Sequence, residues 1–330
     1  MSSDVLSDVL RAVRLTGAVY LSIDASAPFA AEALPARELA PYVMPGVDQV
    51  IEYHLITRGT CWGGIVGEEP LLLQEGDIIA FPHGDPHILS STPGMRGKNS
   101  FQLYRRAAGS QLPFFLREGG GGERTQIVCA FVGCDTRPFN PLLATLPRTL
   151  RVSTRDGGGW LEALAHLAVT ESANPRTGGE SVLARASELM FVEVIRRHVA
   201  SLPPEQTGWL AGLRDPTVGR AMAALHSRPA RAWTVESLAK EAALSRSALA
   251  ERFTHLVGEA PMQYLARWRM QLAATLLRTR NVSVFEAAVE VGYASEAAFS
   301  RAFKKAVGVP PSAWREGRHE DPRAGAARAI

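Results

Sequence analysis

The chain has 330 residues, enough for two compact domains, and its composition (46% hydrophobic, 21% charged) is typical of a soluble globular protein. No uncharged stretch approaches the ~20 apolar residues of a membrane-spanning helix, and residues 2–14 lack the apolar run of a signal peptide, so neither a membrane span nor export is expected. Residues 1–213 contain 18 basic and 22 acidic residues, and residues 214–330 contain 18 and 11, so the excess of positive charge expected of a polyanion-binding domain lies in the C-terminal part.

We predict an α+β multidomain protein whose first domain, residues 1–156, is an antiparallel β-barrel. After a short amphipathic helix, residues 17–132 contain many short apolar or alternating runs separated by Gly, Pro and Asp clusters. Such a pattern is typical of an all-β barrel or sandwich.

Residues 157–213 are predicted to form a helical linker that also carries dimer contacts. The apolar residues of its second helix recur at helical spacing, which predicts that Leu183, Leu189, Val192 and Ile195 are buried. The helix ends before two consecutive prolines, and a DNA-binding domain is predicted at 214–315, followed by a flexible tail at 316–330.

The predicted DNA-binding domain contains the same segment twice, 50 positions apart. The recurring residues are Glu236, Ser245, Ala248, Phe253, Val257, Gly258 and Pro261, which return as Glu286, Ser295, Ala298, Phe303, Val307, Gly308 and Pro311. Each copy predicts a helix, a tight turn of small residues and a second helix capped by the repeated serine, which is the pattern of a helix-turn-helix. A helical bundle with a purely structural repeat is the alternative. The basic charge and the matching caps favour two DNA-binding units, at 234–258 and 284–308.

The apolar face of each second helix predicts which residues are exposed to DNA. The residues expected at base edges are Arg246, Ser247, Ala250 and Glu251 in the first unit and Glu296, Ala297, Ser300 and Arg301 in the second. Arginine bonds bidentately to guanine, so Arg246 and Arg301 are the main candidates, whereas Glu251 either accepts from cytosine or is a solvated charge. Further along, Arg252, Lys304 and Lys305 are expected to contact phosphates.

Residues 215–315 resemble the DNA-binding domain of the AraC-type (AraC/XylS) transcription regulators. The resemblance is carried by the segments 233–239 (WTVESLA), 264–270 (YLARWRM), 288–293 (AVEVGY), 299–305 (FSRAFKK) and 308–315 (GVPPSAWR). It implies sequence-specific binding to double-stranded promoter DNA, commonly as a homodimer and commonly to activate RNA polymerase. The family often has a basic or amide side chain where Glu251 stands, so the first unit is expected to contribute less to base recognition.

The N-terminal domain resembles the cupin-type sensor of one branch of these regulators. The matching residues are Gly76, Pro82, Gly84 and His87 in the second cupin motif (G-x5-P-x-G-x2-H), with Glu52 and Gly59 at the end of the first (E-x6-G). We therefore expect a regulator that is controlled by a small-molecule or oxidant effector.

The first cupin motif is incomplete. Its two histidines would fall on Gly46 and Asp48, so the usual metal-ligand set of cupin enzymes is broken. A cupin-fold, metal-dependent enzyme with a helical appendage is therefore the weaker alternative, and no catalytic residue is assigned.

Four residues nevertheless suggest a metal site: His54, Cys61, His83 and His87. Histidine and cysteine are favoured zinc ligands, and the strands 50–56 and 77–82 can face each other in a barrel. Two interpretations stay open. Either zinc or another divalent metal binds there, or His83 shapes a turn, His54 bonds a backbone carbonyl and Cys61 is a small core residue.

Cys129 and Cys134 also have two interpretations. Five residues apart in one strand they point to opposite faces and cannot bridge, whereas a turn at Gly133 would permit a redox switch. Buried, unreactive thiols are the more common outcome. With Cys61 they form a sparse, odd set that fits a reducing cytoplasm.

Overall fold

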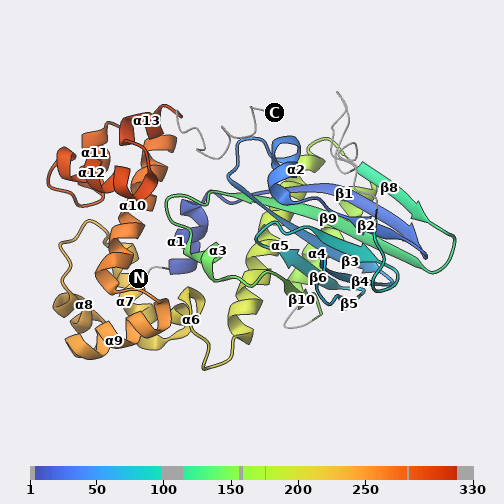
Figure 1. Ribbon diagram of the computed structural model, residues 1–330, viewed down its shortest axis with the longest axis horizontal. Helices are drawn as coiled ribbons and strands as arrows, with labels where there is room; N and C mark the ends of the chain where they lie inside the picture. Colours follow the sequence, from blue (N-terminus) through green and yellow to red (C-terminus); the bar gives the residue numbers. More distant parts are fainter. Residues whose placement is uncertain (1–3, 98–113, 156–158, 175, 281, 318–330) are drawn as a thin grey trace. The chain divides into compact units, whose positions relative to one another are not determined.

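The computed structural model describes residues 4–97, 114–155, 159–174, 176–280 and 282–317 (Figure 1). The chain forms two compact units, each described by itself below. The sheet unit comprises residues 14–135 and 146–202, and the helical unit comprises residues 1–13, 136–145 and 203–330. The predicted tail lies outside the described residues from position 318 onward.

The sheet unit contains two β-sheets and three helices. The larger sheet has the strand order β10-β6-β3-β9-β1-β8, and the smaller has the order β2-β7-β4-β5. The strands are β1 (Thr16–Ser26), β2 (Ala30–Glu32), β3 (Gln49–Arg58), β4 (Thr60–Ile65), β5 (Leu71–Gln74), β6 (Asp77–Phe81), β7 (His87–Ser90), β8 (Phe114–Gly119), β9 (Arg124–Cys134) and β10 (Leu150–Ser153). The helices are α2 (Ala36–Val43), α4 (Trp160–Ala173) and α5 (Gly179–Ser201).

The prediction of a closed antiparallel barrel is wrong in two respects. No hydrogen-bonded strand pair joins the two sheets within the described residues, and β8 runs parallel to β1, with Leu21 opposite Phe114. The inner faces of the two sheets share one apolar core. The alternating apolar residues of the strands are therefore buried between two open sheets, and the strands need not close into a barrel. That pattern is common to barrels and two-sheet folds, and it does not distinguish them.

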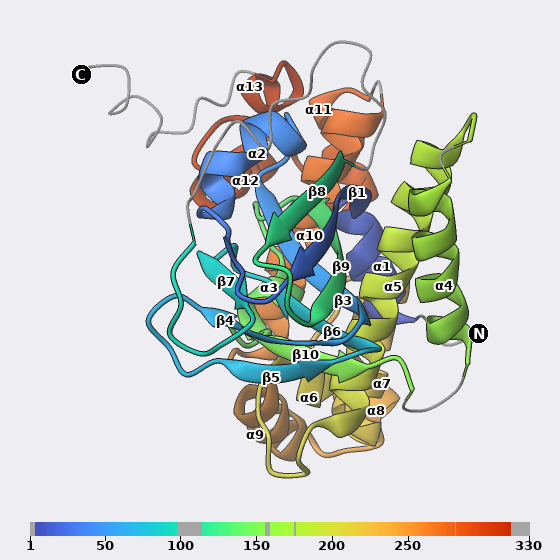
Figure 2. The same cartoon turned by 90° about the vertical axis from the view of Figure 1, so that its right-hand side faces the viewer.

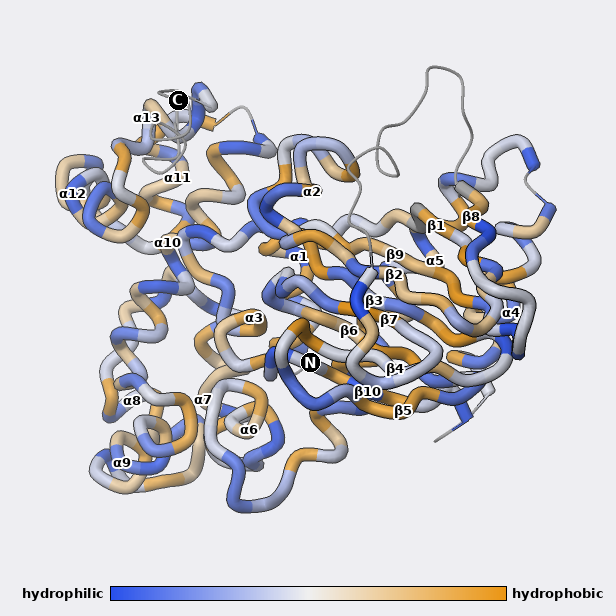
Figure 3. The backbone as a smooth tube through the Cα atoms, turned by 45° about the vertical axis from the view of Figure 1, so that its right-hand side comes forward, coloured by the Kyte–Doolittle hydropathy of each residue, from blue (hydrophilic) through white to orange (hydrophobic). Residues whose placement is uncertain are grey.

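Strand β3 separates two buried environments because successive side chains point to opposite faces of a strand. Val50 and Ile56 belong to the core between the sheets, together with hydrophobic residues of β1, β6 and β9 (Figure 3). On the opposite face, the Tyr53 hydroxyl lies 3.1 Å from the Ser187 carbonyl and 3.0 Å from Ser187 Oγ, both in α5. Helices α4 and α5 lie side by side, and α5 packs against β1 and β9 (Figure 2).

The residues of α5 that are buried agree only in part with those predicted from the helical periodicity of the sequence. Leu183 and Ile195 are buried and Val192 is half-buried, but Leu189 is 49% exposed, so its predicted burial is wrong. Val182, seven residues earlier on the same helix, is 40% exposed. An apolar strip therefore stays on the surface of α5, because α4 and the larger sheet cover its other sides.

The helical unit contains the two predicted helix-turn-helix units and the helices that pack on them. Its helices are α1 (Val5–Ala12), α3 (Pro141–Thr145), α6 (Trp209–Arg214), α7 (Pro216–Ser227), α8 (Val235–Ala242), α9 (Arg246–Val257), α10 (Pro261–Thr279), α11 (Val284–Glu290), α12 (Glu296–Val307) and α13 (Pro311–Arg315). The uninterrupted 19-residue α10 is about 28 Å long and packs against both units, contacting α9 on one side and α11 and α12 on the other.

Gln271 fixes two distant segments of the chain to α10. This residue is only 1% exposed. Its Nε2 donates to the carbonyl of Ala12 at the end of α1 (2.8 Å), and its Oε1 accepts from the backbone N–H of Phe139 (3.0 Å). Residues 1–13 and 136–145 thus pack with the helical unit, although the sequence placed them in the sensor domain. The difference arises from long-range hydrogen bonds that no local pattern reveals.

We expect Gln271→Met to lower the free energy of unfolding by about 1–3 kcal/mol, because it leaves the buried Phe139 N–H without an acceptor. Urea denaturation of the full chain measures this effect. The matched control is Ala266→Met on the same helix, at an exposed position, for which about 0.5 kcal/mol or less is expected. Equal losses for the two variants would show that the buried amide is not a structural link.

Candidate DNA interface and sensor cavity

The first helix-turn-helix is held by side-chain caps at both helix starts. Thr234 Oγ1 accepts from the backbone N–H of Ser237 (3.1 Å), and Ser237 Oγ accepts in return from that of Thr234 (3.0 Å). Ser245 Oγ accepts from the N–H of Ala248 (3.2 Å) at the start of α9. These bonds satisfy N–H groups that have no partner within a helix, which fixes where each helix begins.

The second unit repeats this arrangement at the predicted positions. Ser283 Oγ accepts from the N–H of Glu286 (3.1 Å), and the Glu286 carboxylate accepts from the N–H of Ser283 (2.7 Å). Ser295 Oγ accepts from the N–H of Ala298 (3.2 Å) at the start of α12. Gly292 in the turn has φ +86°, and a Cβ there would lie 2.5 Å from the Ala230 carbonyl, so only glycine fits.

The predicted DNA-contacting residues lie on the outer faces of α9 and α12. Leu249 and Phe253 of α9, and Phe299 and Phe303 of α12, are fully buried and fix the orientation of each helix. Ala250 and Ser300 are half-buried. The remaining predicted residues are exposed: Arg246, Ser247, Glu251 and Arg252 on α9, and Glu296, Ala297, Arg301, Lys304 and Lys305 on α12.

Two arginines of α9 are engaged within the protein. Arg246 Nε lies 2.9 Å from a carboxylate oxygen of Glu236. Arg252 donates twice to Asp215 Oδ2, at 2.5 and 3.0 Å, and Asp215 also caps α7 by accepting from the N–H of Thr217. Burial alone would raise the pKa of Asp215, but the bonds from Arg252 and Thr217 hold it well below its usual value. Arg252 therefore has a structural partner besides any phosphate.

The basic residues of α12 have no such partners. Arg301, Lys304 and Lys305 form no ion pair within the described part of the chain. Their positive charges are consequently available to a polyanion, whereas those of Arg246 and Arg252 are partly neutralised.

The sheet unit encloses a cavity of about 350 Å³ between its two sheets. Its walls are mainly apolar, with Leu21, Ile23, Phe29 and Leu89 among the lining residues. Cavities of this size, mainly apolar with a few polar groups, are typical of small-molecule sites. The polar part of the lining is the ion pair between Arg96 and Glu32, Glu118, and the three residues Glu52, His54 and His87.

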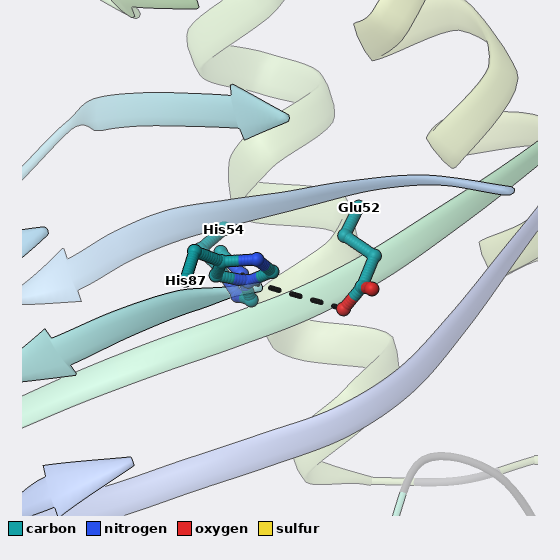
Figure 4. A group of neighbouring side chains, drawn as sticks. All are labelled: Glu52, His54 and His87. Carbon is teal, nitrogen blue, oxygen red and sulfur yellow. Dashed lines mark hydrogen bonds and ion pairs between the residues drawn. The ribbon is translucent and has the colours of Figure 1, made fainter. Parts of the chain in front are cut away.

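Glu52, His54 and His87 form a buried cluster that joins the two sheets (Figure 4). Glu52 and His54 come from the same face of β3 in the larger sheet, and His87 begins β7 in the smaller one. The two histidine Nε2 atoms are 2.6 Å apart, and His87 Nε2 is 3.9 Å from Glu52 Oε2. All three side chains are at most 5% exposed.

The hydrogen bonds of the cluster leave polar atoms unpaired. His87 Nδ1 lies 2.9 Å from the carbonyl of Asp85, so Nδ1 carries the proton and the Nε2 lone pair points into the cluster. Glu52 Oε1 and His54 Nδ1 are buried and have no hydrogen-bond partner within the described residues. Buried polar atoms without partners are rare in native proteins, so these two atoms set the cluster apart from an ordinary core.

Burial keeps the cluster uncharged. It raises the pKa of Glu52 to about 8 and lowers the pKa of His87 to about 4. The pKa of His54 also falls well below its usual value, first through burial and then through the neighbouring His87. At neutral pH both imidazoles are therefore neutral and present lone pairs.

The cluster differs from the four residues expected from the sequence. His54 and His87 do come together, but His83 is exposed and its Nε2 lies 2.9 Å from the Leu146 carbonyl, outside the cluster. Cys61 is buried in the core and is not one of the clustered ligands. The missed member is Glu52. The period of two along a strand places Glu52 on the same face as His54, and this signal was available in the sequence.

The cysteines are all free thiols and all buried. Cys129 and Cys134 both lie in β9, which stays extended through Gly133, so about 16 Å separates them and they cannot form a disulfide. Burial raises the pKa of Cys61 to about 12, and that of Cys129 also rises through burial and then the nearby Glu52. Thiols of this kind are poor nucleophiles. Because β9 is one extended strand, the turn at Gly133 that the Cys129–Cys134 switch requires is absent.

The fold and these sites define a protein with two helix-turn-helix units and a two-sheet unit that contains a cavity, and comparison with known proteins gives the family. A cupin family model matches residues 4–200, and a helix-turn-helix domain model matches residues 238–317. A putative AraC-like transcription regulator of Streptomyces lividans is 35% identical over 270 residues, covering 81% of this chain and 87% of that protein. The regulator AlkR of Acinetobacter baylyi is 27% identical over 316 residues, covering 95% of this chain and 99% of AlkR.

The chain therefore belongs to the AraC-like transcription regulators. Among solved structures, it is similar to the DNA-binding domain of AdpA in complex with a target DNA, with 34% identity and a TM-score of 0.30, covering 31% of this chain and 92% of that one. The relatives from Streptomyces lividans and Acinetobacter baylyi are both described as transcription regulators. No described helix combines the length and apolar character needed to cross a bilayer.

We expect Arg301→Ala to remove discrimination at one base pair, by about 1–3 kcal/mol, because a bidentate contact to a base edge would be lost. Lys305→Ala should instead weaken all sequences alike and lower the salt dependence by about one counterion, because it removes only a phosphate contact. Fluorescence anisotropy over an operator in which each base pair is changed in turn measures both effects. If the two variants give the same pattern, the assignment of Arg301 to a base edge is wrong.

Proposed function

We propose that this protein is an effector-controlled transcription activator of the cytoplasm. Helices α9 and α12 bind two stretches of promoter DNA, and a small molecule in the cavity of the sheet unit controls whether the bound protein activates RNA polymerase. The observation that carries the proposal is the presence, in one chain, of two capped helix-turn-helix units and a largely apolar cavity. A small-molecule effector is favoured over an oxidant because the cysteines are buried and their thiols are poor nucleophiles.

Covalent connections provide a route for the signal. The chain passes between the two units four times, at positions 13/14, 135/136, 145/146 and 202/203. Two of these junctions lie next to the contacts of Gln271: Ala12 is followed by β1, which begins at Thr16, and β9 ends at Cys134, shortly before Phe139. An effector that binds one arrangement of β1 and β9 better than another would thereby change the restraint on α10.

We further propose that the protein acts as a homodimer through the exposed apolar strip of α4 and α5. The strip consists of Trp160, Leu167, Val182 and Leu189, which are each 38–49% exposed. Within each helix the two residues are seven positions apart, which is the spacing of a seam between packed helices.

A function as transcription regulator predicts sequence-specific DNA binding. The purified full chain should bind its own upstream promoter fragment at least ~10³-fold more tightly than a scrambled fragment of equal length, with affinity falling steeply as salt rises. Equal affinity for both fragments, together with metal-dependent turnover of a small substrate, would instead favour the cupin-fold enzyme.

The dimer proposal predicts that Leu189→Glu weakens self-association at least about tenfold, because the interface would bury an unpaired carboxylate. Sedimentation equilibrium of the full chain measures the dissociation constant. Leu72→Glu is the matched control, since Leu72 is an exposed hydrophobic residue (42%) on β5 of the smaller sheet, whereas α5 packs on the larger one. If the wild type is monomeric, or both variants behave alike, dimerisation does not use the strip.

A further inference from the structure

We propose that Glu52, His54 and His87 bind a divalent transition-metal ion, of the class of Zn²⁺ and Fe²⁺, in the wall of the sensor cavity. The inference goes beyond the proposed function, because metal binding requires neither DNA nor an effector. It also differs from the four-residue set expected from the sequence: Glu52 replaces Cys61 and His83.

The first argument is the convergence of three ligating groups in one buried place. One ligand atom from each of the three residues lies within 4.8 Å of the other two, and the three come from two different sheets. Around a metal with ~2.0–2.1 Å bonds, two ligand nitrogens are about 3.3 Å apart. The two Nε2 atoms, now 2.6 Å apart, would need to separate by less than 1 Å, which a rotation of the rings can supply.

The second argument is the tautomer of His87. Its Nδ1–H donates to the Asp85 carbonyl, and this leaves the Nε2 lone pair directed at the cluster. Metal-bound histidines almost always donate their other N–H to a carbonyl, carboxylate or water in this way, which fixes the ring and its tautomer. The backbone turn before β7 thus holds His87 as a ligand in advance.

The third argument is the cost of the cluster without an ion. Glu52 Oε1 is fully buried and has no partner, and the two histidines meet by their ring nitrogens. A packed apolar core would be more stable here than half-satisfied polar groups. A cation would bind the carboxylate and the His87 Nε2 lone pair, and it would replace the proton that His54 Nε2 donates to His87 Nε2, which moves to Nδ1 of the same ring. An ion between the three groups therefore gives the buried carboxylate a partner.

The donor set selects the kind of ion. Two imidazoles and one carboxylate suit zinc and non-haem iron, whereas Mg²⁺ and Ca²⁺ prefer oxygen ligands throughout. Three protein ligands leave at least one coordination position open. Because Glu52, His54 and His87 all line the cavity, that position is accessible to an anionic or otherwise coordinating group of a cavity ligand.

Titration of the untagged full chain with Zn²⁺ and with Co²⁺ tests the proposal. We expect about one equivalent to bind, a visible absorption band typical of low-coordinate Co²⁺, and a raised melting temperature. Glu52→Gln, His54→Asn and His87→Asn should each weaken binding by more than the 10–100-fold that loss of an outer partner typically costs. His83→Ala is the matched control and should bind as the wild type does, since His83 lies outside the cluster.

X-ray absorption of the zinc-loaded wild type keeps the test independent of variants that fail to fold. We expect only nitrogen and oxygen neighbours near 2.0 Å; a sulfur neighbour near 2.3 Å would assign the ion to a cysteine and overturn the proposal. Absence of stoichiometric binding, or loss of binding in His83→Ala alone, would also overturn it. DNA binding measured in parallel separates the two failures, because a regulator that lacks the metal site still discriminates its promoter.

Discussion

The amide of Gln271 is the interaction on which the arrangement of the helical unit depends. It is buried in α10, so both its donor and its acceptor must find partners, and these partners are the carbonyl of Ala12 and the N–H of Phe139. The same helix contributes Met270, Ala273, Ala274 and Leu277 to the core of the second helix-turn-helix unit. One helix therefore meets both DNA-binding units and both segments that continue into the strands β1 and β9. A shift of either segment that broke these bonds would leave a buried polar group unpaired, so α10 and the segments have to move together.

A second constraint is the alternation of β3. Its even-numbered residues include Glu52 and His54 and face the core between the sheets, whereas Tyr53 faces α5 and bonds Ser187. A slip of one residue in the pairing of β3 with β9 would exchange the two sets, placing the polar cluster against α5 and the tyrosine in the cavity. The cavity and the docking of α5 are thus set by one register. Any displacement of Glu52 or His54 would therefore act on β3, the strand whose opposite face supports α5.

The sequence predicted what depends on local chemistry and missed what depends on distant contacts. The caps at Ser245 and Ser295 and the burial of Phe253 and Phe303 follow from spacing alone, and the structure confirms them. Residue type predicts His54 and His87 as metal ligands, and their side chains do meet. It predicts His83 as well, but the turn between β6 and β7 directs this side chain to the Leu146 carbonyl. The open sheets, the exposure of Leu189 and the packing of residues 136–145 with the helical unit all depend on which surfaces meet in three dimensions.

The two helix-turn-helix units share a scaffold but not an electrostatic surface, and this difference has a consequence for DNA binding. On α9, Arg246 and Arg252 are each held by a carboxylate, Glu236 and Asp215, and Glu251 adds an exposed negative charge. On α12, Arg301, Lys304 and Lys305 form no ion pair within the described residues, and Glu296 is the one acidic residue of the helix. Because non-specific affinity depends on neutralising phosphates, most of it is expected from α12. Arg246 must first leave Glu236 to reach a base, so the loss of this ion pair reduces the net gain from any bidentate contact. The first unit is therefore expected to contribute less than the second both to affinity and to base recognition, and the two half-sites should tolerate base changes to different degrees.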